Sequence, residues 1–169
     1  MIAYFLLVAA VAGERLVELV VSSRHARWAF ARGGVEYGRA HYPVMAAVHA
    51  ALLISCVVEV VAADRPFLPW LGWPMLAVVL AAQALRWWCV ATLGNQWNTR
   101  VIVVPGLPLV THGPYRWLRH PNYVAVAAEV AALPLVHTAW VTAVVFTAAN
   151  IALMSVRIPV EERALATVR

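Results

Sequence analysis

The chain has 169 residues, of which 63% are hydrophobic and 12% are charged, and its mean hydropathy is +0.76. Soluble domains contain about 45–50% apolar and about 25% charged residues, so this composition excludes an ordinary soluble domain and predicts an integral membrane protein. All thirteen basic residues are arginine, and the net charge is +5. In a membrane protein, orientation across the bilayer explains this balance better than binding to nucleic acid does. The two cysteines, Cys56 and Cys89, lie in apolar segments and predict neither a disulfide framework nor a metal site.

Five apolar segments follow one another and predict an all-α integral membrane protein with about five transmembrane helices. They cover residues 1–21, 42–63, 71–93, 123–136 and 138–156. A helix needs about 20 apolar residues to cross a bilayer, and at 1.5 Å per residue the fourth segment covers only about 21 Å. We therefore expect the last two helices to form a tight hairpin, with the start of the fourth below the headgroups.

The arginines predict the orientation, because cytoplasmic loops of membrane proteins carry an excess of basic residues. With the N-terminus outside, the external loops hold only Arg65. The cytoplasmic loops and tail then hold Arg24, Arg27, Arg32, Arg39, Arg100, Arg116, Arg119, Arg157, Arg163 and Arg169. The sequence thus predicts an external N-terminus and a cytoplasmic C-terminus.

Polar, cationic and aromatic side chains are densest between Thr111 and Tyr123, in the long predicted cytoplasmic loop. Gly113-Pro114 indicates a turn, and Pro121 suits the first residue of a helix. A helix start offers unpaired N–H groups and the positive end of its dipole, which together form an anion site. The alternative is an ordinary cytoplasmic loop that holds positive charge at the membrane surface.

The apolar residues 101–104 precede this stretch and are followed by Pro105-Gly106. Pro-Gly suits the centre of a type II turn. We expect residues 101–110 to turn back on themselves and to lie against the membrane surface as a lid.

Ionisable residues inside the apolar segments cost free energy in a membrane and are therefore candidates for function. Glu14, Arg15 and Glu18 share one face of the first helix and are expected to pair with one another. Glu59 is expected at the interface, and His49 is expected to be a hydrogen-bonded packing residue rather than a ligand.

Arg86 lies in the third segment, where it either extends its charge to the headgroups or stays buried beside a functional site. Glu129, in the fourth segment, is either the partner of a buried arginine or a proton acceptor, and we favour the partner. The chain ends with Arg157 closing the last segment and Glu161-Glu162 following. Without other features, the best interpretation of this tail is structural: an arginine that extends its charge to the headgroups, followed by a solvated helix start.

Taken together, these motifs resemble the isoprenylcysteine carboxyl methyltransferase family of membrane enzymes. The matching residues are Leu85-Arg86, Gly94, Asn98, Leu109-Val110-Thr111, Gly113, Tyr115, Arg119-His120-Pro121-Asn122-Tyr123, Arg157 and Glu161-Glu162. The Arg-His-Pro-x-Tyr core is fairly specific, although related membrane reductases carry a similar version. The first half resembles the bacterial branch loosely, through Glu14-Arg15-x-x-Glu18 and Glu36-x-Gly38-x-x-His41-Tyr42-Pro43.

The resemblance implies S-adenosylmethionine as the methyl donor, bound on the cytoplasmic side. It assigns the cofactor contacts to Leu109, Val110, Tyr115, His120, Pro121, Asn122, Tyr123 and Glu161. It assigns orientation of the acceptor to Arg86 and Arg157, which are then expected to meet beside the donor methyl. One departure is the apolar run at 101–104, where the family has a polar cofactor contact.

We therefore expect one membrane-embedded domain over residues 1–169, with a two-helix N-terminal part (1–70) and a part that binds cofactor and acceptor (71–169). The expected reaction is methyl transfer to an oxygen of a lipophilic small molecule that enters from the lipid bilayer. A lipidic phenol such as an alkylresorcinol is the first candidate acceptor, and a lipidic or isoprenylcysteine carboxylate is the second. A phenol, with a pKa near 10, needs an arginine or a base that favours the phenolate, and His112, Glu129 and Glu162 remain open as the base.

Two other functions compete with this interpretation. One is an NADPH-dependent membrane reductase, because such enzymes share the Arg-His-Pro-x-Tyr region. The other is a non-catalytic membrane scaffold, which leaves the co-occurrence of Arg86, the 119–123 cluster and the 157–162 tail unexplained. No metal and no nucleic acid is expected as a partner.

Overall fold

The computed structural model describes residues 1–167, and within them the expected all-α architecture of five helices is confirmed. The α-helices are α1 (Ile2–Phe30), α2 (His41–Ala62), α3 (Pro69–Leu93), α4 (Pro121–Leu135) and α5 (Trp140–Ala166). Two 3-10 helices, η1 (Gly94–Gln96) and η2 (Gly113–Arg116), and two strands, β1 (Val35–Tyr37) and β2 (Val101–Val103), complete the described elements. Arg169, which the orientation argument counts, lies outside the described residues.

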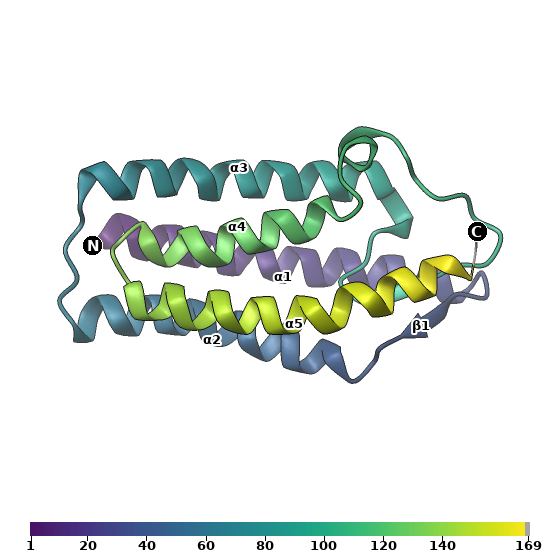
Figure 1. Ribbon diagram of the computed structural model, residues 1–169, viewed down its shortest axis with the longest axis horizontal. Helices are drawn as coiled ribbons and strands as arrows, with labels where there is room; N and C mark the ends of the chain where they lie inside the picture. The colour runs from purple at the N-terminus through teal and green to yellow at the C-terminus, as the bar shows by residue number, and fades with distance from the viewer. Residues whose placement is uncertain (168–169) are drawn as a thin grey trace.

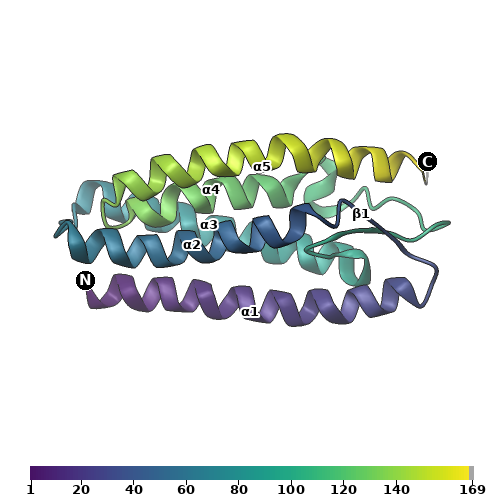
Figure 2. The same ribbon diagram turned by 90° about the horizontal axis from the view of Figure 1, so that it is seen from below.

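The five helices lie side by side along the long axis of the molecule (Figures 1 and 2). Helix α4 lies between α3 and α5, and α2 packs against both α5 and α1. The N-terminus and the short connections are at one end. The strands, the long segment between α3 and α4 and the end of α5 are at the other, which we call the ribbon end. Segments that carry the predicted cytoplasmic arginines therefore gather at one end of the bundle.

Within residues 1–167, three stretches are long and apolar enough to cross a membrane unaided, namely α2, residues Pro69–Gln96 and α5. Helix α4 has only 15 residues. Helix α1 carries Glu14, Arg15 and Glu18 near its middle, but Glu18 is buried while Leu16, Val17, Leu19 and Val20 are exposed on the outside of the bundle. Near the middle of α1, the buried Glu18 thus faces the protein, and the exposed apolar side chains face outward.

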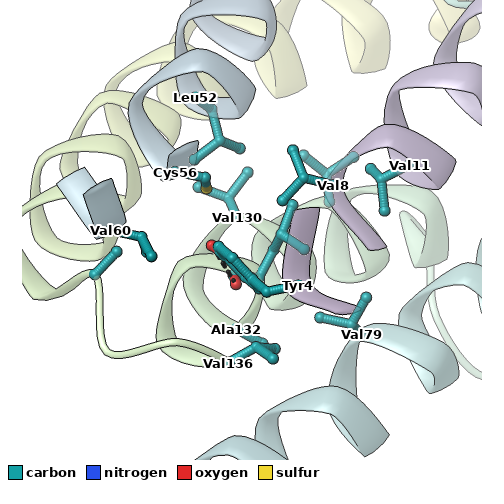
Figure 3. Close-up of a cluster of buried hydrophobic side chains, with 13 residues drawn as sticks. Tyr4, Val8, Val11, Leu52, Cys56, Val60, Val79, Val130, Ala132 and Val136 are labelled. Atoms are coloured by element: carbon teal, nitrogen blue, oxygen red, sulfur yellow. Dashed lines mark hydrogen bonds between the residues drawn. The ribbon is translucent and has the colours of Figure 1, made fainter. Parts of the chain in front are cut away.

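A core of small apolar side chains joins the helices in the half of the bundle that contains the N-terminus (Figure 3). Val8 of α1, Val60 of α2 and Val130 of α4 are each 5% exposed or less. The hydroxyl of Tyr4 donates a hydrogen bond to the Leu133 carbonyl at 3.2 Å, so the one polar atom of this side chain is satisfied. Helices in lipid associate through close packing rather than through the hydrophobic effect, which explains the small side chains.

The expected tight hairpin of the last two helices is confirmed, since α4 ends at Leu135 and α5 begins at Trp140. Glu59 of α2 accepts hydrogen bonds from the backbone N–H groups of Val141, at 3.1 Å, and Thr142, at 2.6 Å. A carboxylate at this place satisfies the open N–H groups of a helix start. Glu59 is therefore a cap for α5, a role that its sequence position alone did not indicate.

Residues 101–103, the first arm of the predicted turn-back, form a strand. Strand β2 pairs antiparallel with β1, with Val35 opposite Val103 and Tyr37 opposite Val101. The β-branched residues favour an extended backbone, but the partner strand lies far away in the sequence and leaves no local signal. The turn itself is confirmed, because Gly106 has a φ of 79°, which suits the third position of a type II turn.

Candidate functional site

A cavity of about 470 Å³ lies at the ribbon end of the bundle, within the usual range of small-molecule sites. Its wall consists of the segment after α3, strand β2, the loop before η2, the first turn of α4 and the last turns of α5. The residues that the resemblance assigned to a cofactor all line it: Leu109, Val110, Tyr115, His120, Pro121, Asn122, Tyr123 and Glu161. Arg157 lines it as well. Five parts of the chain thus meet here.

Local sequence explains how two of these parts reach the cavity. Helix α4 begins at Pro121, as predicted, with no side chain capping its N-terminus. Gly113, with a φ of 59°, starts η2, and a Cβ at this position would lie only 2.6 Å from the hydroxyl of Thr92 in α3. Glycine therefore lets η2 pack closely against α3 and brings Tyr115 to the cavity wall.

One side of the cavity is apolar. Val101, Val103 and Val104 are buried at 9% exposure or less, and Leu107 and Leu109 continue the same wall. The departure from the family pattern noted in the sequence is thus an apolar surface facing the cavity.

Another part of the wall, formed by His120, Tyr123, Glu161 and Glu162, is charged and polar. His120 Nδ1 lies 3.5 Å from a carboxylate oxygen of Glu161, and Nε2 lies 3.4 Å from one of Glu162. The Glu161 carboxylate raises the pKa of His120, and this outweighs the opposite effect of burial. Tyr123 stacks on the His120 ring, and its hydroxyl donates a hydrogen bond to Glu161. The imidazolium form of His120 is therefore favoured between two carboxylates.

Among the described residues, three buried polar atoms in the cavity wall lack a hydrogen-bond partner. These are Trp97 Nε1, which is a donor, Asn122 Oδ1, which is an acceptor, and Nδ1 of His120. Buried polar groups in native proteins are nearly always satisfied. The cavity wall therefore has both donor and acceptor atoms free for hydrogen bonds with whatever fills the cavity.

Arg157 is 8% exposed and is held by residues of three different segments. Its Nε donates to the Tyr123 hydroxyl at 2.9 Å, its Nη1 lies 3.3 Å from the Met45 sulfur, and its Nη2 donates to the Thr99 carbonyl. Within residues 1–167, it forms no ion pair with a carboxylate. A buried guanidinium without a counter-ion is costly, so this position favours an anionic ligand.

The structure does not bring Arg86 to the cavity or into contact with Arg157, contrary to the expectation that both meet beside a methyl donor. Arg86 is 5% exposed and pairs with Glu18, at 3.3 Å, and with Glu129, at 3.5 Å. Arg15 lies 2.5 Å from both carboxylates. We call these four residues the buried charge cluster. A guanidinium in the bilayer needs counter-charges, and α1 and α4 supply them.

Glu129 is therefore the partner of arginines, as favoured from the sequence, and the expected Arg15–Glu18 pair within α1 is also confirmed. What the sequence did not indicate is that these two pairs form one cluster joining α1, α3 and α4. His49 makes a 2.8 Å contact with the Met45 carbonyl, in keeping with a packing role.

Of the three candidate bases, only Glu162 lines the cavity. Among the described residues, no three His, Cys, Asp or Glu side chains are grouped so that they could hold a metal ion. Sequence reasoning missed the contribution of Trp97 and Arg100, although the amide-rich run from Gly94 to Asn98 was a signal. It also missed Met45, for which no local signal exists.

Comparisons with known proteins agree with the sequence motifs. The family model described as the isoprenylcysteine carboxyl methyltransferase (ICMT) family matches residues 75–167. An uncharacterized protein of Bacillus subtilis (strain 168), YpbQ, is 38% identical over 163 residues, which are 96% of either chain. An uncharacterized Haemophilus influenzae protein is 25% identical over 154 residues, covering 89% of this chain and 88% of that one.

A similar solved structure is that of the eukaryotic intramembrane Ras methyltransferase ICMT, without a monobody. The match has a TM-score of 0.57 and 25% identity, and it covers 74% of this chain and 46% of the other. This chain therefore spans less than half of the length of the solved relative.

Proposed function

Because the chain belongs to the isoprenylcysteine carboxyl methyltransferase family, we propose that it transfers a methyl group from S-adenosylmethionine to an oxygen of a lipophilic small molecule. The observation that carries the proposal is the cavity, which unites the donor-binding residues implied by the family motifs with Arg157. A scaffold has no need of such a cavity.

The wall of the cavity fits the chemical groups of the donor. The valine and leucine side would hold the adenine ring, and the free Trp97 and Asn122 atoms supply one donor and one acceptor. Glu161 is placed for the ammonium or ribose hydroxyls, and His120, at the uncapped start of α4, for the carboxylate. The His120–Glu161 contact would then be exchanged for contacts with opposite charges on the ligand.

Arg157 is the residue that we assign to the acceptor. S-adenosylmethionine supplies an electrophilic methyl group on a sulfonium, and transfer to oxygen is an in-line displacement. The protein contributes mainly by positioning and by excluding water. The Arg157 guanidinium can fork onto a carboxylate or phenolate oxygen and hold it in line. A carboxylate acceptor is ionised at neutral pH and needs no base, whereas a phenol would lose its proton to Glu162, the candidate base at the cavity.

The acceptor classes we propose are a lipidic phenol such as an alkylresorcinol and, second, a lipidic or isoprenylcysteine carboxylate. Because both are lipophilic anions at the moment of transfer, the same arginine suits both. We further propose that Arg86 serves the buried charge cluster and not the acceptor.

Calorimetry on the purified protein tests the choice of cofactor. We expect S-adenosylhomocysteine to bind with a Kd in the micromolar range, because the cavity has groups for both charges of its amino-acid part, and we expect no heat from NADPH. The control is Glu161→Gln, which should weaken binding by about tenfold, the loss of one charge-assisted hydrogen bond of roughly 1.5 kcal/mol. Binding of NADPH in place of S-adenosylhomocysteine would favour the reductase, and binding of neither would favour the scaffold.

We propose that the ribbon end is cytoplasmic and the N-terminus external, as the arginine distribution indicates. Cysteine labelling in intact cells tests this, because both native cysteines are buried. Asp64→Cys, in the exposed turn after α2, should react with a membrane-impermeant maleimide, and Arg116→Cys in η2 should react only after permeabilisation. The opposite pattern would invert the protein and place the cavity outside the cell.

A further inference from the structure

The cavity wall is tied to helix α1, which precedes the residues matched by the family model. Ser22 is 3% exposed, and its Oγ lies 2.8 Å from both Asn98 Oδ1 and the Thr99 hydroxyl. The same oxygen accepts the Thr99 backbone N–H at 3.1 Å, and the Ser22 carbonyl accepts from Asn98 Nδ2 at 3.1 Å. One serine therefore holds two consecutive residues of the segment that follows η1.

The same segment holds Arg157. The carbonyl of Thr99 accepts a hydrogen bond from Nη2 of Arg157, so Thr99 is fixed to Ser22 on one side and to Arg157 on the other. The remaining contacts of this guanidinium are a tyrosine hydroxyl, Tyr123, and a thioether, Met45, which is a weak acceptor. The Thr99 carbonyl is thus one of only two strong acceptors that the described residues offer to Arg157.

We propose that Ser22 is a positioning residue for Arg157, acting through the Thr99 carbonyl. The inference rests on the proposed function, because it assigns to α1 a part in orienting the methyl acceptor. Ser22 touches neither donor nor acceptor. Ser22 fixes the position of Asn98 and Thr99, and the Thr99 carbonyl in turn orients the Arg157 guanidinium. Binding groups need such supporting contacts to hold their geometry within about 0.5 Å.

Ser22→Ala removes the hydroxyl and should leave Arg157 with one less fixed contact. The adjacent Ser23→Ala is a matched control, because Ser23 is exposed and bonds only the Val20 carbonyl of its own helix at 2.8 Å. We expect Ser22→Ala to reduce kcat/KM with a long-chain alkylresorcinol or an isoprenylcysteine as acceptor probe by about tenfold. The affinity for S-adenosylhomocysteine should change by less than about threefold, since no donor contact is removed.

Two measurements separate positioning from a general loss of structure. In the Arg157→Ala background, Ser22→Ala should have no further effect on methyl transfer, because residues that act through one group are not additive. In protein labelled with ¹⁵N-arginine, the Arg157 Nε–H signal, identified by its absence in Arg157→Lys, should shift or broaden in Ser22→Ala and stay unchanged in Ser23→Ala.

An unchanged Arg157 signal in folded Ser22→Ala would overturn the inference, as would additive effects in the double variant. The signal can be followed without any acceptor. If the wild-type protein binds no S-adenosylhomocysteine, the proposed function fails, and a shift of the arginine signal still shows whether Ser22 positions Arg157.

Discussion

Replacing Arg157 with alanine should lower kcat/KM for methyl transfer by at least 10²-fold, about 3 kcal/mol of transition-state stabilisation. Arg157 is the buried cation at the cavity without a carboxylate partner among residues 1–167, so the acceptor anion is its natural counter-charge. Arg157→Lys should rescue little, because lysine keeps the charge but loses the fork that holds an oxygen in line. Steady-state kinetics with labelled S-adenosylmethionine measures both variants.

Arg163→Ala is the control for this prediction. Arg163 lies on the same helix but is exposed, and its Nε donates only to the Pro159 carbonyl at 3.1 Å. Its removal should leave kcat/KM within about twofold, as surface substitutions usually do. If Arg157→Ala folds normally and loses S-adenosylhomocysteine binding instead of turnover, Arg157 belongs to the donor site and our division of roles is wrong.

Local features of the structure could be predicted from the sequence, whereas contacts between distant segments could not. Apolar segments, Pro121 at the start of α4 and the Pro105-Gly106 turn are local features, and the structure has them as predicted. The grouping of residues 109–123 with Glu161 at one cavity came from family motifs, since a cavity formed by several separate parts of the chain has no local pattern.

The role of Arg86 could not be predicted because it depends on which helices are neighbours. From the sequence, Glu18 pairs within its own helix, and Arg86 either extends its charge to the headgroups or is buried beside a functional site. In the bundle, α1 packs so that Glu18 also faces Arg86 at 3.3 Å, which makes the guanidinium part of an ion cluster. The same reasoning applies to strand β1 and to Ser22, whose partners are set by tertiary contacts.

The buried charge cluster should dominate stability. It holds two arginines and two carboxylates, so its net charge is zero. Glu129→Met leaves one buried positive charge in excess, and breaking a buried pair in this way costs about 3–5 kcal/mol. Unfolding of the purified protein in mixed detergent micelles should report this loss. Methyl transfer per folded molecule should change little, because none of the four residues lines the cavity.

The double variant Arg15→Met/Glu129→Met is the decisive comparison. Each single change unbalances the cluster, but the double change removes one charge of either sign and leaves the Arg86–Glu18 pair, 3.3 Å apart, intact. Apolar replacement of a whole buried pair is often neutral or stabilising, so the double variant should be more stable than either single variant.

Glu14→Gln is the control, because Glu14 bonds Trp87 at the edge of the bundle and glutamine still accepts that hydrogen bond. Its effect should stay within about 0.5 kcal/mol. Simple addition of the Arg15 and Glu129 effects would mean that the two residues are not electrostatically coupled, and α1 would then be held to α3 and α4 by packing alone.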